Sequence, residues 1–258
     1  MRSISYVLKK KQTFFLYMKV AIVIAGLPRF FDSHTYNTIK EHFLDKYDCD
    51  IYAHFWFIKN EEDTYIVSHW IPKNIFPRDT ITRFYELYKP VKVLYDNPMI
   101  KDELSSNEFY IMKSFYTSKQ KAFNLISDIN KYDFIINMRS DMVFLRVPDL
   151  QELDTFKIHI VLQDEGRDVF NDLFSIIPPD FASRFYNTVD TFDSLFDKQS
   201  KIYGEDVYKT ILIQANLMNC IVKHHRNNFT MGVQRQGEYI QVCINDSDWL
   251  KITDKLIT

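Results

Sequence analysis

Residues 131–145 read KYDFIINMRSDMVFL and hold two apolar runs with a charged triplet between them. The first run, 134–138, is rich in β-branched and aromatic residues and predicts a buried strand. It ends at Arg139-Ser140-Asp141, and a second apolar run follows at once at 142–145. The pattern predicts two buried strands with an arginine and an aspartate at the break between them.

The segment before this strand predicts a helix over 106–131. Apolar residues share one face of it at 100° per residue: Met112, Phe115, Ala122, Phe123 and Ile126. Upstream, strands are expected at 19–26, 49–57 and 91–96, with helices at 32–47 and 79–88. Downstream, strands are expected at 156–164, 171–177 and 220–225, with helices at 180–196 and 204–218. Alternation of strands and helices indicates an α/β fold with a mixed, mainly parallel sheet flanked by helices.

Composition narrows the class of protein. The 258 residues are 46% hydrophobic and carry a net charge of −2, so a large core is available and no basic field exists for nucleic acid. Three cysteines without metal spacing favour a reducing compartment. The five glycines form neither GxGxxG nor GxxxxGK[ST].

The N-terminal segment is expected to be an extension, residues 1–17, with the folded domain at 18–258. Its apolar pieces are too short for a membrane span and no small-residue cleavage site follows, so a cytoplasmic protein without a transmembrane segment is expected. Without repeats or clear linkers, the domain is expected to be single, with unequal halves at 18–145 and 146–258. The oligomeric state is not predictable.

Ligands bind beyond the carboxyl ends of the strands in open α/β sheets, and Arg139 and Asp141 follow such an end. The aspartate suits a divalent cation and the arginine a diphosphate; a salt-bridged surface turn is the alternative. Lys119 interrupts the apolar face of the 106–131 helix and either faces a bound phosphate or reaches water along its stem. Gly26 and Arg29, in AGLPRFF from Ala25, belong either to a ligand loop or to an ordinary turn.

Two later motifs carry ionisable groups. Glu205 and Asp206 begin a helix with Gly204 as an acceptable N-cap, and carboxylates in this position either offset the helix dipole or act as a general base. In KHHRNN (223–228), a histidine is either structural or a partner of Asp141 in a metal site.

Taken in order, these motifs resemble glycosyltransferases of the GT-A fold that use nucleotide sugars, especially bacterial and large-virus transferases of surface polysaccharide assembly. The matching stretches are KVAIVIAGLPRFF, DIYAHFWF, YDFIINMRSDMVF, VFNDLFSIIPPDFASRFY and GEDVY, across about residues 18–230. The resemblance implies a Rossmann-like nucleotide-binding half at 18–145 and an acceptor and catalytic half at 146–258. It further implies transfer of a hexosyl or pentosyl group from a nucleotide sugar, with UDP favoured, to a glycan hydroxyl, with inversion.

The resemblance also assigns residues to roles. Asp141 matches the last aspartate of the DxD motif, which binds Mn²⁺ or Mg²⁺ and the donor diphosphate, while Arg139 replaces the first aspartate. Asp206, beside Glu205, matches the base, and His225 the late metal-binding histidine. Donor contacts are expected from Ala25, Gly26, Arg29, Lys119, Arg139 and Asp141, and a contact to donor sugar or acceptor from Asp172.

Two alternatives differ in class. A nucleotidyltransferase would carry a glycine-rich signature after the first strand, and AGLPRF is poor in glycine. A non-catalytic pseudo-glycosyltransferase, acting as a nucleotide-sugar binding or assembly module, would fit the incomplete DxD motif.

Overall fold

The fold is given by a computed structural model, which describes residues 18–32, 34–57, 64–68, 71–164, 169–225, 229–234, 239–242 and 249–251. The expected extension, residues 1–17, lies outside the described residues. No helix in the described part of the chain is long and apolar enough to cross a bilayer.

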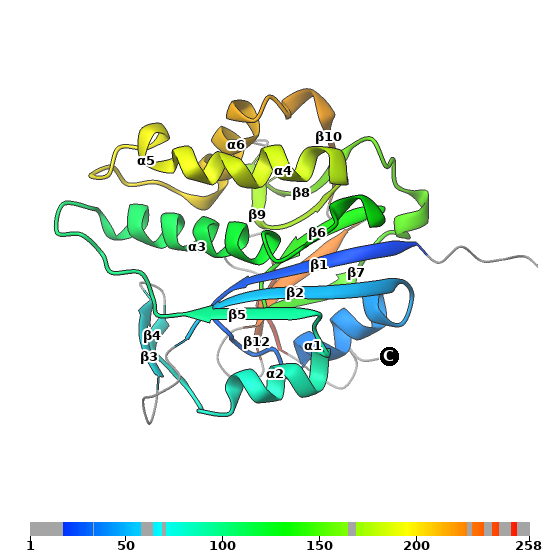
Figure 1. Cartoon of the computed structure of the whole chain (residues 1–258), viewed down its shortest axis with the longest axis horizontal. Coiled ribbons are helices and arrows are strands. Elements are labelled where there is room, and N and C mark those ends of the chain that lie inside the picture. Colours follow the sequence, from blue (N-terminus) through cyan, green and yellow to red (C-terminus); the bar gives the residue numbers. More distant parts are fainter. Residues whose placement is uncertain are drawn as a thin grey trace, which may run out of the picture.

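A seven-stranded sheet forms the centre of the molecule (Figure 1), in the order β10-β8-β9-β6-β1-β2-β5. Its strands are β1 (Lys19–Gly26), β2 (Asp48–Trp56), β5 (Lys92–Asp96), β6 (Phe134–Met138), β8 (Ile158–Asp164), β9 (Val169–Ile177) and β10 (Ile221–His224). Neighbouring strands are parallel except where β9 pairs with β6 and β8. The predicted mixed, mainly parallel sheet is confirmed, and both halves of the chain contribute strands to it.

Two smaller sheets were not foreseen. The second apolar run of the opening stretch is a strand, β7 (Met142–Arg146), but it leaves the main sheet and pairs with β11 (Thr230–Gln234). β12 (Tyr239–Val242) and β13 (Trp249–Lys251) extend that sheet, and β3 (Thr64–Ser68) pairs with β4 (Ile71–Phe76). The chain therefore passes from one sheet to another through the Arg139-Ser140-Asp141 triplet.

Helices cover both faces of the main sheet (Figure 1). α1 (His34–Ile39), continued by a π-helical turn at Lys40–Leu44, and α2 (Thr80–Tyr88) lie on one side. On the other side lie α3 (Asn107–Phe123), α4 (Pro179–Asn187), α5 (Phe192–Leu195) and α6 (Gly204–Gln214). This double cover explains why all of β1 after Lys19 is buried although it does not alternate with polar residues.

Each face of the sheet has its own core. In β1, Val20, Ile22 and Ile24 pack into the core beneath α1 and α2. The alternate residues Ala21, Val23 and Ala25 pack into the core beneath α3, α4 and α6. Because successive side chains of a strand point to opposite faces, one apolar run supplies both cores.

Three predicted helices are too long. α3 ends at Phe123 rather than 131, and Asp128 then caps a separate 3₁₀ turn through its side chain. The 180–196 helix is broken into α4, a 3₁₀ turn at Thr188–Thr191, and α5. α6 ends at Gln214 instead of 218, because Asn216 has a φ of 56°, a left-handed conformation that stops a helix.

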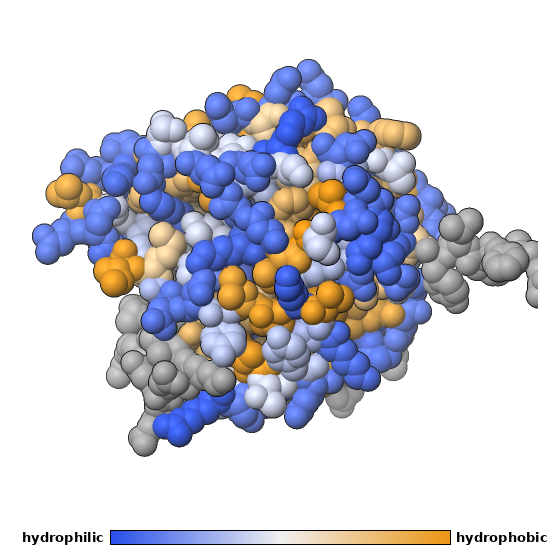
Figure 2. All heavy atoms as spheres, viewed as in Figure 1, coloured by the Kyte–Doolittle hydropathy of each residue, from blue (hydrophilic) through white to orange (hydrophobic). Residues whose placement is uncertain are grey.

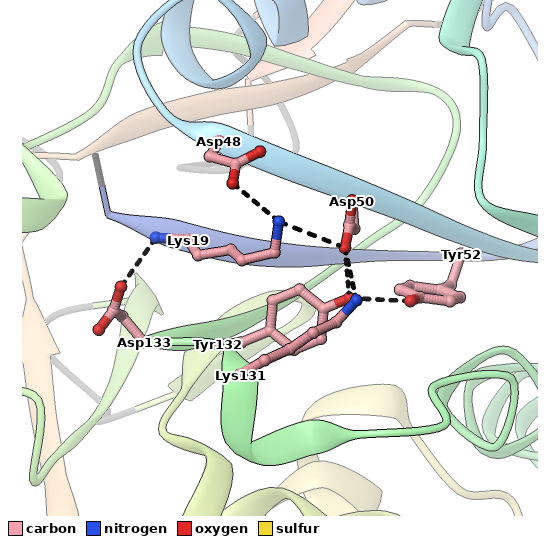
Figure 3. A network of polar contacts seen from close by, with 7 residues as sticks. All are labelled: Lys19, Asp48, Asp50, Tyr52, Lys131, Tyr132 and Asp133. Atoms are coloured by element: carbon pink, nitrogen blue, oxygen red, sulfur yellow. Dashed lines mark hydrogen bonds and ion pairs between the residues drawn. The ribbon is translucent and has the colours of Figure 1, made fainter. Parts of the chain in front are cut away.

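Polar contacts tie together the amino ends of β1, β2 and β6 (Figure 3). The Lys19 ammonium lies 2.7 Å from Asp48 and 3.7 Å from Asp50. Asp50 also accepts from the Lys131 ammonium at 2.9 Å and from the Tyr132 hydroxyl at 2.7 Å. This network joins β1 and β2 to the turn that leads into β6, at the edge of the sheet where these strands begin.

Figure 2 shows hydrophobic residues gathered near the middle of the face that Figure 1 presents, in the region of β5 and β2. β5 is an edge strand of the main sheet, and Leu94 within it and Val91 just before it remain exposed. Tyr85 of the adjacent α2 is exposed as well.

Candidate functional site

The carboxyl ends of β1, β2, β5 and β6 meet at one edge of the main sheet, on the left of Figure 1. The antiparallel β9 begins at the same edge, because its Ser175 pairs with Asn137 near the end of β6. Asp172 lies three residues before Ser175, so β9 extends past the end of β6 toward Arg139. The predicted donor-binding residues therefore meet at the edge where ligands of open α/β folds bind.

Arg139 and Asp141 form a two-point ion pair. The Arg139 Nε donates to Asp141 Oδ1 at 2.9 Å, and a guanidinium N–H donates to Asp141 Oδ2. The Asp141 side chain is only 1% exposed and that of Arg139 20%. The salt bridge of the turn alternative is thus present, but its carboxylate is buried and its guanidinium only partly exposed, so the pair is sensitive to any bound charge.

Ser140, between them, holds the loop that follows β1. Its hydroxyl lies 2.8 Å from the Leu27 carbonyl and 3.0 Å from the Arg29 carbonyl, and it accepts from the Arg29 N–H at 3.0 Å. The charged triplet and the predicted ligand loop are therefore one unit. Sequence alone did not single out Ser140, since a serine in a turn has no specific signature.

Gly26 allows the chain to turn at the end of β1. Its φ is +112°, a conformation that residues with a side chain rarely adopt, although a Cβ there would meet only the Phe115 ring at 3.8 Å. Ala25, just before it, is buried beneath α3. The conformation of the backbone, rather than lack of space, requires glycine at position 26.

Lys119 does not reach water: its side chain is fully buried. The ammonium donates to the Asp172 carbonyl at 2.6 Å and lies 4.1 Å from the Phe115 ring centre and 4.5 Å from that of Tyr116. Burial lowers the pKa of Lys119 to about 7, with the Arg139 charge acting in the same direction and Asp172 against it. The predicted alternative of a solvent-reaching stem is wrong.

Asp172 lies between this lysine and the start of α6. Burial raises the pKa of its carboxyl group, although Lys119 and Arg139 oppose the change. A Cβ on Gly204 would lie 2.3 Å from Asp172 Oδ2, so the carboxylate lies against the first turn of α6. Residue 204 must lack a side chain for this packing, and the amino end of a helix favours a negative charge there.

The expected base residues begin α6, but the cap differs from the prediction. Tyr203 is the N-cap, and Gly204, the expected cap, is the first helical residue. Glu205 is half-buried and Asp206 exposed. Burial raises the pKa of the neighbouring Tyr116, and the negative charges of Asp172 and Glu205 add to this effect. Of the three carboxylates at the start of α6, Asp172 is buried more deeply than Glu205 and Asp206.

The expected metal ligands were Asp141 and His225. Arg139 engages both carboxylate oxygens of Asp141. His225 is exposed just beyond β10, and His224 within that strand approaches His159 at 2.9 Å. In the described part of the chain, no group of three or more His, Cys, Asp or Glu side chains is arranged to hold a metal ion.

The structure adds residues that sequence reasoning missed. His54 in β2 and Ser118 in α3 are both fully buried, and their side chains are in contact at 2.7 Å beneath Gly26. A histidine within the apolar run CDIYAHFWF was the available signal, because it is the only strongly polar residue of that run after Asp50. Its partner, contributed by a helix far along the chain, had no signal.

Comparison with known proteins gives only distant likenesses. No family model and no curated protein matches the sequence. Among solved structures, the apo-form glycosyltransferase GlyE of Streptococcus pneumoniae TIGR4 matches 82% of this chain and 46% of its own, at 10% identity and a TM-score of 0.47. This chain therefore spans about half the length of that protein.

Two further structures carry similar titles. A glycosyltransferase involved in glycosylation of the major capsid of PBCV-1 matches over 81% of this chain and 82% of its own, at 9% identity and a TM-score of 0.37. The bifunctional glycosyltransferase WbbM in its apo form matches over 82% and 39%, at 12% identity and a TM-score of 0.38. All three belong to the class that the sequence motifs resemble, yet at these values they assign no activity to this chain.

Proposed function

We propose that this chain is a glycosyltransferase that moves a sugar from a nucleoside-diphosphate sugar, with UDP favoured, to a glycan hydroxyl with inversion. The observation that supports it is the meeting of Arg139, Asp141, Lys119 and Asp172 with the Gly26 loop at the carboxyl edge of the sheet. We place the reaction in the cytoplasm.

The reaction needs positive charge on one side of the sugar and a base on the other. Arg139, with its side chain partly exposed, would bind the diphosphate oxygens and stabilise the charge that develops on them. Gly26 lets the donor approach the backbone closely, and Arg29 follows in the same loop. Lys119 is too deep to touch the donor, so its charge would act through Asp172.

A carboxylate near the start of α6 would take the proton of the acceptor hydroxyl. The hydroxyl oxygen then bonds to the anomeric carbon while the bond from that carbon to the diphosphate oxygen breaks, and the nucleoside diphosphate leaves with the electron pair. Asp206 and Glu205 are proposed for the base, and Asp172 for contacting the reacting sugars.

A divalent cation is not given a step in this scheme. Both oxygens of Asp141 accept from Arg139, and the described residues bring no group of three or more His, Cys, Asp or Glu side chains together, so the residues observed there do not fit a metal ion. Arg139 supplies positive charge at the place where the resemblance puts the cation.

A thermal-shift screen tests the proposal with UDP-, GDP-, CMP- and dTDP-sugars, each with and without Mn²⁺. One donor class should stabilise the protein by about 2.7 kcal/mol at 100 times its dissociation constant. Asp141→Asn should abolish donor turnover with little change in volume, whereas Asp48→Asn, at the opposite edge of the sheet, should not. Near-normal turnover in Asp141→Asn would contradict the assignment.

The second candidate, a non-catalytic nucleotide-sugar binding module, is favoured by the Arg139–Asp141 pair, in which both carboxylate oxygens already accept a hydrogen bond. The same screen separates the two. A binding module would show the thermal shift but neither transfer nor slow donor hydrolysis, with or without Mn²⁺.

A further inference from the structure

A chain of hydrogen bonds, buried except at its Asp96 end, leads to the Gly26–Arg29 loop. Asp96, at the end of β5, lies with Oδ2 at 3.2 Å from His54 Nε2. His54 Nδ1 lies 2.7 Å from the Ser118 hydroxyl, and that hydroxyl lies 2.8 Å from the Gly26 N–H. A row of hydrogen bonds thus connects four residues, one from each of β5, β2, α3 and β1.

The direction of this chain follows from the chemistry of its ends. Asp96 pairs with the Lys121 ammonium, and this contact holds the pKa of its carboxyl group below the usual range, so the carboxylate only accepts. His54 Nε2 must therefore carry the proton, which leaves Nδ1 as the nearer acceptor of the Ser118 O–H, at 2.7 Å, with the His54 carbonyl as its second acceptor at 3.1 Å. The Ser118 oxygen in turn accepts from the Gly26 N–H.

The neutral form of His54 is the one that this order requires. Its side chain is fully buried against α3, and burial lowers its pKa to about 4, with Asp96 opposing and Lys121 adding to the change. Near neutral pH the imidazole is therefore both a donor and an acceptor, as the two contacts demand.

The last link fixes Gly26 in its unusual conformation. Gly26 is the final residue of β1, and its N–H is directed into the protein toward Ser118 rather than toward a ligand. Ser140 holds the following residues of the loop from the other side, through Leu27 and Arg29. The two serines together determine the path of the loop.

We propose that His54 and Ser118 are positioning residues that set the Gly26–Arg29 loop for nucleotide binding, with Asp96 fixing the proton order from the rim of the sheet. This deepens the proposed function, because the loop is the part of the site assigned to the donor. Neither side chain touches the donor, since both are fully buried.

The Gly26 amide is the direct reporter of this arrangement. Ala25-Gly26 is the only alanine-glycine pair among the five glycines of the chain, so ¹³C-carbonyl alanine with ¹⁵N-glycine labelling leaves a single peak in a carbonyl-edited NMR spectrum. Its hydrogen-exchange rate should rise about tenfold in Ser118→Ala, the factor that corresponds to about 1.4 kcal/mol. Asp96→Ala, which removes the acceptor of His54 Nε2 together with the Lys121 ion pair, should move the same peak.

A matched control is Thr188→Val, which removes another buried hydroxyl and its 2.9 Å hydrogen bond to the Arg184 carbonyl, outside the site. It should lower the melting temperature without altering the Gly26 peak. The positioning role is wrong if Asp96→Ala leaves that peak unchanged, or if Thr188→Val moves it as much.

Nucleotide binding is measured separately, by calorimetric titration with UDP. Ser118→Ala should weaken UDP binding about five- to tenfold, and Thr188→Val by less than about twofold. Equal UDP affinity in Ser118→Ala and the unmutated chain would overturn the positioning role. If the unmutated chain binds no nucleoside diphosphate, the proposed function fails, while the NMR result still decides whether the hydrogen-bond chain sets the loop.

Discussion

Among the residues of the candidate site, Lys119 is the one whose burial most clearly destabilises the folded chain. A fully buried ammonium loses its hydration, and the aromatic rings of Phe115 and Tyr116 with one carbonyl replace only part of it. Burying such a lysine lowers the free energy of unfolding. Buried lysines with a shifted pKa are typical of functional sites, so the place of Lys119 beside Asp172 is consistent with the proposed function.

The cost of Lys119 should be visible in the pH dependence of stability. Its pKa is about 7 in the folded chain and 10.5 as the ordinary value, so the unfolded chain binds more protons between these values. Stability should therefore rise with pH, by about 2 kcal/mol from pH 7 to 9. Urea unfolding at pH 7, 8 and 9 measures it, and Lys119→Met should flatten the rise; an equal rise in that variant would refute the cause.

Among the elements, β10 is an edge strand joined to β8 by a pair of histidines. His159 Nδ1 lies 2.9 Å from His224 Nε2, so at least one of the two rings must be neutral for one nitrogen to accept. Burial lowers the pKa of His224 to about 4, and repulsion from His159 and His225 adds to this. The contact between His159 and His224 is thus expected to break when both rings are protonated in acid.

Acidification should loosen β10 before the rest of the sheet. Because the folded pKa of His224 lies below 6.5, its contribution is complete above pH 6.5 and lost as the pH falls toward 4. Protection of residues 221–224 against hydrogen exchange should fall between pH 7 and 5 by about 1–2 kcal/mol, allowing for partial exposure. His224→Gln should remove this pH dependence; protection that falls equally in β1 would contradict a local opening.

The elements also show how far sequence reasoning extends. Every strand of the main sheet was predicted, because short apolar runs such as 19–26, rich in β-branched residues and ended by a glycine, indicate strands covered on both faces. The four-stranded sheet that contains β7 was missed, because β7 follows β6 directly and only its pairing with β11 reveals the change of sheet. Helix ends were misplaced where a local cap or a left-handed residue decided them, as at Asn216.

The candidate site divides in the same way. Arg139, Asp141 and Lys119 stood out because a charge within an apolar pattern is visible in one segment. Ser140, His54 and Ser118 did not, because their importance lies in contacts between segments far apart in sequence. Glycine at 204 was interpreted as a cap, while its missing side chain instead makes room for Asp172.

At the scale of the whole molecule, the two edges of the main sheet differ in character. Where β1, β2 and β6 begin, Lys19, Asp50 and Tyr132 join the strands through ion pairs and hydrogen bonds (Figure 3). Where the same strands end, the charges surround the candidate site. Lys19 and Gly26 are separated by the length of β1, about 20 Å. Substitutions at the two edges should therefore act independently.

Asp50→Asn tests this separation. Hydrogen bonds from Lys131 and Tyr132 and the charge of Lys19 lower the pKa of Asp50, although burial opposes them, so its contribution is present above the ordinary carboxyl pKa and lost in acid. The variant should lose about 1–2 kcal/mol of stability at pH 7, measured in urea, with UDP affinity unchanged. A matching loss of UDP affinity would show that the edges are coupled.

The two cores that share β1 have a consequence for how this sequence can vary. One set of neighbours packs against Val20, Ile22 and Ile24, and a different set packs against Ala21, Val23 and Ala25. Alternate residues of β1 thus belong to different cores, one on each face of the sheet. A change of volume at Val20, Ile22 or Ile24 must therefore be compensated beneath α1 and α2. A change at Ala21, Val23 or Ala25 must instead be compensated beneath α3, the helix that carries Ser118 and Lys119.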